Sequence, residues 1–210
     1  MNNDIITGVK NYYSKKVLEY GPTPMGVDWN SKESQYVRFT QLCKLINPHS
    51  PFTLLDYGCG YGELINFLTN SDELKKFKYY GFDISNTMIN YAKKEFKDTI
   101  DVIFFEELPN IKFDYVIASG IFNVKLSLAD DDAWLSYILN TLNLFNQLTT
   151  MGFSFNVLTK YSDENRMKDY LYYADPLFLF DYCKNHFSRN IALLHDYDLY
   201  EFTILVKKNG

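Results

Sequence analysis

The sequence predicts a single α/β domain built on a mostly parallel β-sheet. From residue 52 onward, short apolar runs alternate with longer amphipathic stretches, which is the pattern of repeated β-α-β units. Two of the last apolar runs are separated by only a few residues, and a link that short requires an antiparallel hairpin. A chain of 210 residues can bury one full core. We therefore expect a parallel sheet that ends in an antiparallel pair.

The expected elements follow from the chain in order. A preface holds a helix over residues 5–20, a loop rich in proline and glycine over 20–30, and a second helix that Ser31 can cap. The strands before the hairpin are expected at residues 53–57, 78–83, 101–105, 113–119 and 152–158. Helices are expected at residues 61–69, 86–96, 130–149 and 176–186, and the hairpin strands at 190–195 and 199–207.

Composition and charge argue against several classes of partner. The net charge of −5 comes from 21 basic and 26 acidic side chains, and the lysines are scattered among the acids. Nucleic-acid binding favours clustered Lys and Arg, so we expect no such partner. The apolar runs are too short to span a bilayer and the first residues lack a signal-peptide pattern, which predicts a cytoplasmic protein without membrane contact. Three scattered cysteines and no Cys/His cluster predict free thiols and no metal site.

The strongest functional signal lies where the first strand of the sheet ends. The run LLDYGCGYG at residues 54–62 combines a strand, the acid Asp56 and three glycines ahead of a helix. Glycines let a loop turn sharply and bring its backbone against a ligand. A second acid, Asp83, ends the next strand in GFDIS, at the same edge of the sheet. There Asp83 can accept hydrogen bonds from the ribose hydroxyls of a nucleoside, or it can cap the following helix.

These two motifs together resemble the first two motifs of class I S-adenosylmethionine-dependent methyltransferases. The resemblance extends over residues 52–207 and includes the terminal hairpin. It implies a doubly wound, seven-stranded, mostly parallel sheet in the order 3-2-1-4-5-7-6, with an antiparallel C-terminal hairpin. It also implies S-adenosylmethionine as cofactor and S-adenosylhomocysteine as product. Residues 1–50 are then an N-terminal helical lid within the same domain as the methyltransferase core at 51–210.

The resemblance also assigns expected roles at the cofactor. Gly58 and Gly60 would lie along the methionine part and the ribose, and Asp56 would orient the loop and the cofactor's amino group. Asp83 would bind the ribose hydroxyls, with Ile84 packed on the adenine.

Further cofactor contacts are expected from more distant positions. Glu106, or its neighbour Glu107, would bind the adenine amino group, and Ser119 would lie beside the sulfonium. Arg38 can clamp the methionine carboxylate with two hydrogen bonds, or it can form an ion pair with a nearby acid. Three aromatic residues of the preface can cover the pocket: Tyr12, Tyr13 and Trp29.

The methyl acceptor is predicted by elimination. Methyltransferases that act on amines of DNA or protein often carry N-P-P-Y or D-P-P-Y after the fourth strand, whereas residues 119–123 here read SGIFN. We therefore expect an oxygen of a small molecule, a hydroxyl, phosphoryl or carboxyl group of a sugar nucleotide, surface polysaccharide or specialised metabolite. Asn123, Tyr172 and Tyr173 are the candidate substrate contacts. His195 is the candidate base, because histidine titrates near neutral pH.

Three other functions stay open on the sequence alone. They are N-methylation of a small molecule, oxidoreduction with a bound NAD, and a non-catalytic binding module that has kept the fold. The spacing G-x-G-x-G departs from the G-x-G-x-x-G of dinucleotide dehydrogenases and argues against the second of these. The chain is expected to be a monomer or a homodimer.

Overall fold

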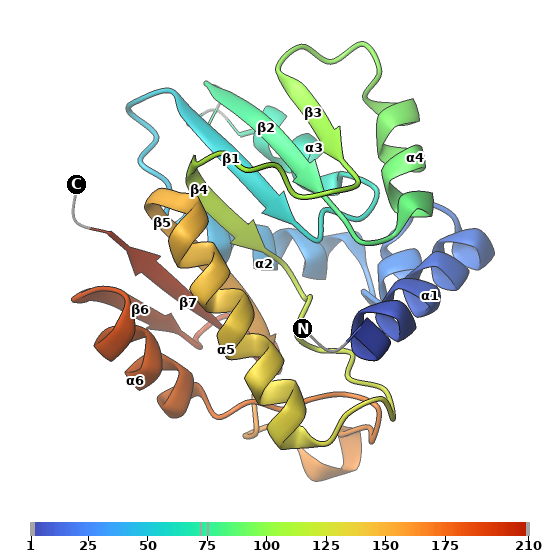
Figure 1. Ribbon diagram of the computed structural model, residues 1–210, viewed down its shortest axis with the longest axis vertical. Coiled ribbons are helices and arrows are strands. Elements are labelled where there is room, and N and C mark those ends of the chain that lie inside the picture. Colours follow the sequence, from blue (N-terminus) through green and yellow to red (C-terminus); the bar gives the residue numbers. More distant parts are fainter. Residues whose placement is uncertain (1–2, 72, 75, 209–210) are drawn as a thin grey trace.

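The computed structural model describes residues 3–71, 73–74 and 76–208, which fold around one seven-stranded sheet (Figure 1). The remaining residues of the predicted lid and core ranges lie outside this description. The strands are β1 (Phe52–Tyr57), β2 (Phe77–Phe82), β3 (Val102–Phe105), β4 (Phe113–Ala118), β5 (Thr149–Leu158), β6 (Asn190–Leu194) and β7 (Glu201–Lys207). Their order is β3-β2-β1-β4-β5-β7-β6, and β7 is antiparallel to both of its neighbours. This confirms the predicted fold class and strand order.

Helices cover both faces of the sheet and create two hydrophobic clusters. On one face lie α5 (Asp131–Leu148) and α6 (Pro176–His186); on the other lie α2 (Lys32–Cys43), α3 (Glu63–Thr69) and α4 (Asn86–Glu95) (Figure 1). Successive residues of β4 alternate between the clusters, with Val116 in the first and Ile117 in the second. Burial on both faces explains why this strand is apolar almost throughout.

The first helix of the N-terminal preface, α1 (Asn3–Tyr20), lies beyond the carboxyl ends of β1 and β2 (Figure 1). The preface consists of α1, the 3-10 helix η1 (Pro24–Val27) and α2, whose first turn is capped by Ser31 through the Ser34 N–H at 3.1 Å. The hydroxyls of Ser14 on α1 and Ser85 before α4 are 2.7 Å apart. Because the contact between Ser14 and Ser85 joins the preface to the core, α1 is held over the edge of the sheet where the glycine loop opens.

Most element boundaries differ from the sequence expectation by one to three residues, and two of these differences concern residues discussed for the site. The helix expected at residues 61–69 begins at Glu63, because Gly62 takes a left-handed conformation with φ of 91°. The first strand of the hairpin, β6, ends at Leu194, so His195 lies beyond it in the connecting loop. A second 3-10 helix, η2 (Glu164–Arg166), interrupts the segment between β5 and α6.

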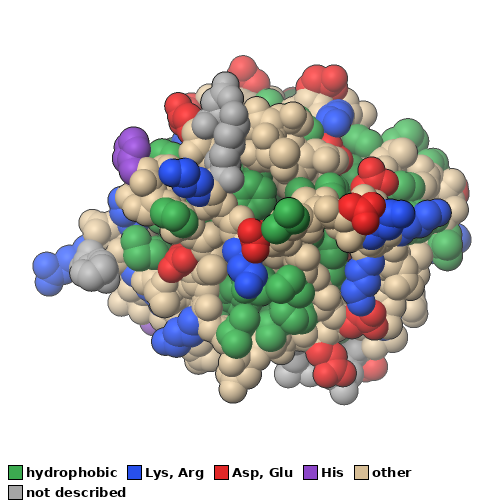
Figure 2. Space-filling view, turned by 90° about the horizontal axis from the view of Figure 1, so that it is seen from above, with side chains coloured by type: hydrophobic (Ala, Val, Ile, Leu, Met, Phe, Trp, Pro, Cys, Tyr) green, Lys and Arg blue, Asp and Glu red, His purple; other side chains and the backbone are tan. Residues whose placement is uncertain are grey.

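Surface charge is mixed rather than segregated. On the face shown in Figure 2, basic and acidic side chains are interspersed around hydrophobic groups. Within the described ranges, no helix is both long and apolar enough to cross a membrane. The same residues contain no group of three or more His, Cys, Asp or Glu side chains arranged to hold a metal ion.

Candidate cofactor and acceptor site

The glycine loop after β1 is tied to the end of β2 by its backbone. The N–H groups of Gly58 and Cys59 both donate to the carbonyl of Phe82, at 2.7 and 3.0 Å. Gly58 has φ of 83°, and a Cβ atom there would lie 2.3 Å from Cγ2 of Ile121. A side chain at Gly58 would therefore meet both backbone strain and a steric clash, which explains the glycine at this position.

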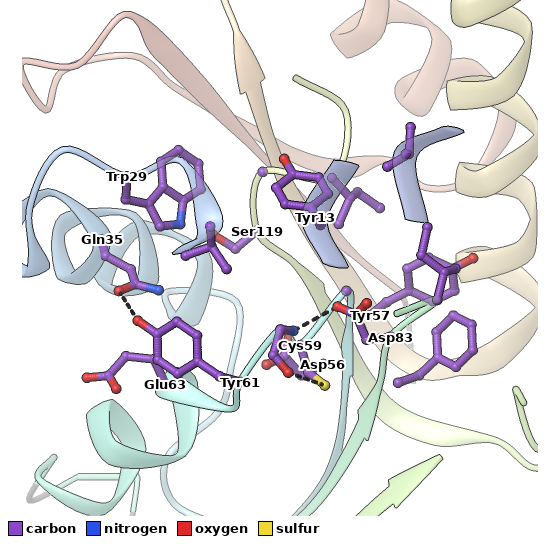
Figure 3. Close-up of a pocket in the computed structure, with 18 of the residues that line it drawn as sticks. Tyr13, Trp29, Gln35, Asp56, Tyr57, Cys59, Tyr61, Glu63, Asp83 and Ser119 are labelled. Atoms are coloured by element: carbon purple, nitrogen blue, oxygen red, sulfur yellow. Dashed lines mark hydrogen bonds between the residues drawn. The ribbon is translucent and has the colours of Figure 1, made fainter. Parts of the chain in front are cut away.

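Asp83 closes the other side of this loop. Its carboxylate accepts a hydrogen bond from the N–H of Gly60 at 2.9 Å (Figure 3). It also accepts one from the N–H of Ser85 at 2.8 Å. The side chain that caps α4 is Ser85, which accepts from the Met88 N–H, so the alternative of Asp83 as the helix cap is excluded. Burial raises the pKa of Asp83 to about 6, although its two backbone hydrogen bonds act in the opposite direction.

Asp56 lies beneath the same loop as a second buried carboxyl group. The Tyr79 hydroxyl donates a hydrogen bond to it at 2.6 Å. Burial raises the pKa of Asp56 to about 7, and the negative charge of Asp83 adds to this effect. Two buried acids thus stand side by side at the carboxyl ends of adjacent strands.

The first cavity lies between this loop and the N-terminal preface (Figure 3). Its floor includes Asp83 and Ile84, and its roof includes Tyr13 and Trp29 from the preface. Ser119 also lines it, and the buried Ser119 hydroxyl has no hydrogen-bond partner among the residues described. A buried hydroxyl without a partner is rare in folded proteins and indicates a place for a polar group of a ligand.

A second cavity of about 450 Å³ adjoins the first. This volume is within the range of small-molecule sites. Both cavities are lined by Tyr13, Val27, Trp29 and Gly120, which we call the shared wall. The remaining lining of the second cavity is Lys16, Tyr20, Met25, Asp28, Asn30, Arg38, Asn123, Val124, Leu158, Lys168, Tyr170, Leu171 and Glu201.

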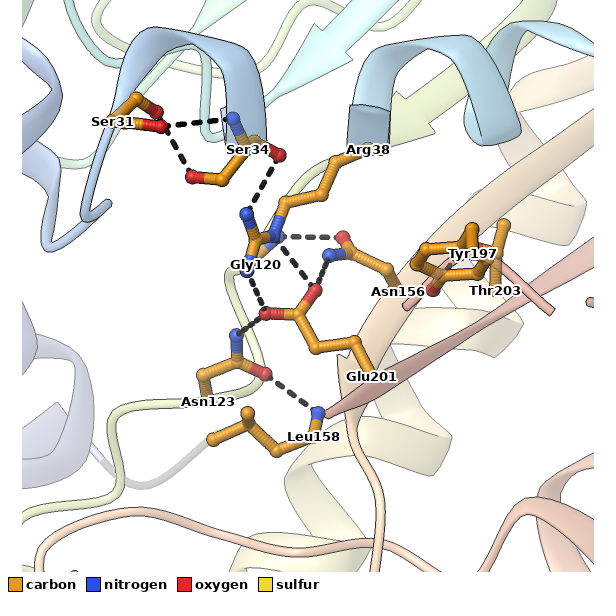
Figure 4. A network of polar contacts seen from close by, with 10 residues as sticks. All are labelled: Ser31, Ser34, Arg38, Gly120, Asn123, Asn156, Leu158, Tyr197, Glu201 and Thr203. Atoms are coloured by element: carbon orange, nitrogen blue, oxygen red, sulfur yellow. Dashed lines mark hydrogen bonds and ion pairs between the residues drawn. The ribbon is translucent and has the colours of Figure 1, made fainter. Parts of the chain in front are cut away.

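A buried ion pair forms part of the floor of the second cavity (Figure 4). Arg38 donates from Nε and Nη2 to the two carboxylate oxygens of Glu201, at 2.9 and 2.7 Å, and from Nη1 to the Ser34 carbonyl at 2.7 Å. Glu201 is 1% exposed and also accepts from the amides of Asn156 and Asn123. Full hydrogen bonding of this kind is what makes a buried ion pair tolerable.

This network also fixes the shared wall. The Gly120 N–H donates to the Asn156 side chain at 2.8 Å, and the Arg38 guanidinium stacks on the Trp29 ring at 3.9 Å from its centroid. Gly120 has φ of 75°, and a Cβ atom there would lie 2.4 Å from the Trp29 ring. The Trp29 ring can therefore pack against the backbone at position 120 only because that residue is glycine.

The structure brings most of the predicted cofactor residues together. Six of them line the first cavity: Asp56, Gly58, Gly60, Asp83, Ile84 and Ser119. Tyr13 and Trp29 line it as well, whereas Asn123 lines the second cavity. The placement of Arg38 corrects the expected clamp on the methionine carboxylate. Its guanidinium is committed to Glu201 and faces the second cavity, which removes Arg38 from the proposed cofactor ligands.

Six other predicted residues line neither cavity, and two of them are Tyr12 and Glu107. Glu106 is exposed and forms an ion pair with Lys93 at 2.9 Å. His195 is exposed, with its ring edge toward Phe202, so the expected base is not at the site. Tyr172 is buried in a hydrophobic cluster, and the Tyr173 hydroxyl accepts from the backbone of Lys168, so neither reaches the expected substrate contact.

Glu201 and Asn156 are the residues that the sequence reasoning missed. Glu201 is the one acid at the head of the apolar run 202–206. A charged side chain at the start of a buried strand needs a partner of opposite charge. The sequence therefore indicates that Glu201 is paired, but not with which residue. The partner itself, Arg38, is 163 residues away, beyond any local pattern.

Comparisons with known proteins show the family of the chain. Residues 48–171 match the family described as "Methyltransferase domain". The chain is 45% identical over 168 residues to the Mycobacterium tuberculosis protein Rv1506c, whose name describes it as a methyltransferase; the match covers 79% of this chain and 98% of that one.

Solved structures share the fold at low sequence identity. Magnesium protoporphyrin IX methyltransferase of Synechocystis, solved with bound S-adenosylhomocysteine, has a TM-score of 0.66 at 16% identity over 98% of this chain and all of that one. An S-adenosylmethionine-dependent methyltransferase of Aquifex aeolicus has a TM-score of 0.58 at 14% identity, covering 85% and 94% of the two chains. Together with the family match, these findings show that the chain belongs to the class I S-adenosylmethionine-dependent methyltransferases.

Proposed function

We propose that the protein transfers a methyl group from S-adenosylmethionine, bound in the first cavity, to an oxygen of a small molecule bound in the second. The observation that carries this proposal is the shared wall of Tyr13, Val27, Trp29 and Gly120. Because these four residues line both cavities, the two cavities are neighbours, and we propose that a donor in one and an acceptor in the other meet between these side chains without crossing bulk water. Holding two reactants in this way supplies much of the rate enhancement of a transfer reaction.

The residues of the first cavity suit the proposed cofactor. Each oxygen of Asp83 accepts one backbone hydrogen bond and keeps a lone pair, so the carboxylate can also accept from two ribose hydroxyls. Ile84 offers an apolar surface for the adenine, and the unpartnered Ser119 hydroxyl is available to a polar group of the cofactor. Gly58 leaves room for the ligand against the backbone, and Asp56 supports the loop from below.

When bound, S-adenosylmethionine supplies a methyl group already activated on a sulfonium, which a nucleophile takes by in-line displacement. The protein must therefore hold the two reactants, align them for the displacement and exclude water from them. Trp29 and Tyr13 cover the first cavity, and the Arg38–Glu201 network keeps Trp29 in place. Neither lining set contains a histidine, so we assign no histidine base. The sugar-nucleotide or polysaccharide acceptor stays a prediction, because none of the relatives compared above identifies one.

Isothermal titration with S-adenosylmethionine and, in parallel, with NADH tests the proposal. We expect a saturable heat with S-adenosylmethionine and none with NADH. Fractions of a metabolite extract would then be screened for formation of S-adenosylhomocysteine. Binding of NADH with no response to S-adenosylmethionine would contradict the proposal, and binding without turnover in any fraction would favour a non-catalytic module.

A further inference from the structure

The charges that line the second cavity do not balance. Its lining contains three cationic side chains, Lys16, Arg38 and Lys168, and two carboxylates, Asp28 and Glu201. Lys16 is paired with Asp28 at 2.8 Å, and Arg38 is paired with Glu201 at 2.7 Å. Lys168 is left as a cation with no carboxylate partner in the part of the chain that the structure describes. The cavity therefore carries a net positive charge within a protein whose total charge is −5.

Lys168 is carried by a segment that the structure holds firmly. Its backbone N–H donates to the Tyr173 hydroxyl at 2.9 Å, and its ammonium group donates to the Tyr170 hydroxyl at 3.4 Å. The carbonyl of Tyr170 accepts from the N–H groups of Lys125 and Leu126, at 3.0 and 2.8 Å. Lys168 is thus an exposed residue at the border of the second cavity, and hydrogen bonds fix the backbone that carries it.

The rest of the lining combines apolar side chains with polar ones such as Asn30 and Asn123. Apolar and aromatic side chains contribute much of the lining, namely Tyr20, Met25, Val124, Leu158 and Leu171. At the shared wall, the Tyr13 hydroxyl has no hydrogen-bond partner among the described residues. Burial raises the pKa of Tyr13 well above its ordinary value, so its phenol stays neutral and can donate a hydrogen bond.

We infer that the methyl acceptor is an apolar or aromatic molecule with one anionic group, a carboxylate or a phosphate, and that Lys168 is the counter-ion of that group. This inference rests on the proposed function, because it takes the second cavity as the acceptor site. An anion approaching a protein of net negative charge meets long-range repulsion, and a local unpaired cation is what reverses it. A hydrogen bond from an ammonium to an anion is also stronger than one between neutral groups.

Matched ligands test the inference without knowledge of the natural acceptor. The full chain, saturated with S-adenosylhomocysteine, is titrated with 4-hydroxycinnamate, with its neutral carboxamide and with phenyl phosphate, and the dissociation constants are measured by ligand-observed NMR. We expect at least one of the two anions to bind roughly tenfold more tightly than the carboxamide. The stronger of the two anions then identifies carboxylate or phosphate as the recognised group.

Three variants test whether Lys168 is the residue that causes the preference for anions over the neutral carboxamide. Lys168→Gln is expected to remove the preference for the anion, and Lys168→Arg to keep it. Lys94→Gln makes the same change of charge on the exposed side of α4, outside both cavities, and should leave the preference intact. Equal binding of anions and carboxamide, no binding of either anion, or a preference that survives Lys168→Gln would overturn the inference. Absence of S-adenosylhomocysteine binding in the wild type would instead count against the proposed function.

Discussion

The two cavities share a wall but are built from different parts of the chain. The first is formed largely by loops that directly follow β1, β2 and β4, with backbone groups and the carboxylate of Asp83 at its centre. The second is formed by side chains from the N-terminal preface, from the segment around Lys168 and from β7. The first cavity thus depends on the geometry shared by parallel strand ends, whereas the second depends on side-chain contacts between segments far apart in the sequence. We expect changes in the two regions to have separable effects.

The largest effect is expected on the acceptor side, from loss of the buried ion pair. Arg38→Met leaves Glu201 charged and buried without its counter-ion, which should lower the free energy of unfolding by about 3–5 kcal/mol. Urea unfolding measures this loss. In a double-mutant cycle with Glu201→Met, the double variant should be less destabilised than the sum of the two single variants. A loss below about 1 kcal/mol for Arg38→Met would show that the Arg38–Glu201 pair does not stabilise the floor of the second cavity.

The second prediction concerns the pH dependence of stability, which arises from two carboxyl groups at the first cavity. The pKa values of Asp56 and Asp83 rise from 3.8 to about 7 and about 6 in the folded protein. Between pH 4 and 7 the folded state therefore binds protons that the unfolded state has released, and the stability of the ligand-free protein falls as pH rises. The slope reaches up to about 1.4 kcal/mol per pH unit for each carboxyl group.

Urea unfolding at a series of pH values checks this slope. Asp56→Asn removes the group that titrates higher, so its stability curve should be flatter than that of the wild type between pH 6 and 7. Identical slopes for the two proteins would contradict the assignment of a raised pKa to Asp56.

The third effect isolates cofactor binding. Asp83→Ala removes a charged acceptor from the proposed ribose contact, which should weaken binding of S-adenosylmethionine by about 2–3 kcal/mol, or roughly 30- to 150-fold. Calorimetric titration measures the change. Asp181→Ala removes an equal charge from an exposed position on α6 and should bind like the wild type. Unchanged affinity in Asp83→Ala would place the cofactor elsewhere.

The fourth prediction concerns Gly120, which lines both cavities, so a substitution there should disturb both of them. A Cβ atom at Gly120 would collide with Trp29 in addition to the strain of its φ of 75°, so Gly120→Ala should cost more than the about 1–2 kcal/mol of a left-handed alanine. Gly21→Ala is the matched control, because Gly21 has φ of 70° and open space around it. The two variants are compared by urea unfolding and by tryptophan fluorescence. Equal losses would mean that Trp29 is not fixed against Gly120.

The same division explains what the sequence could predict. Asp56, Gly58 and Asp83 follow strands whose alternation with helices is visible in the chain, and parallel strands bring their carboxyl ends to one edge. The second cavity has no such local rule, because Arg38 and Glu201 meet only after the whole sheet has formed. The prediction of His195 as the base depends on the usual pKa of histidine and not on a contact at the site. Nothing in a hairpin pattern reveals whether a loop residue faces a site, and this one is exposed.

A crystal structure with S-adenosylhomocysteine tests the two-cavity arrangement most directly. The account predicts that the ribose lies on Asp83 and that the sulfur lies within van der Waals reach, about 4 Å, of the shared wall and faces the second cavity. A sulfur that points away from Tyr13 and Gly120, or a nucleoside bound outside the first cavity, would contradict it.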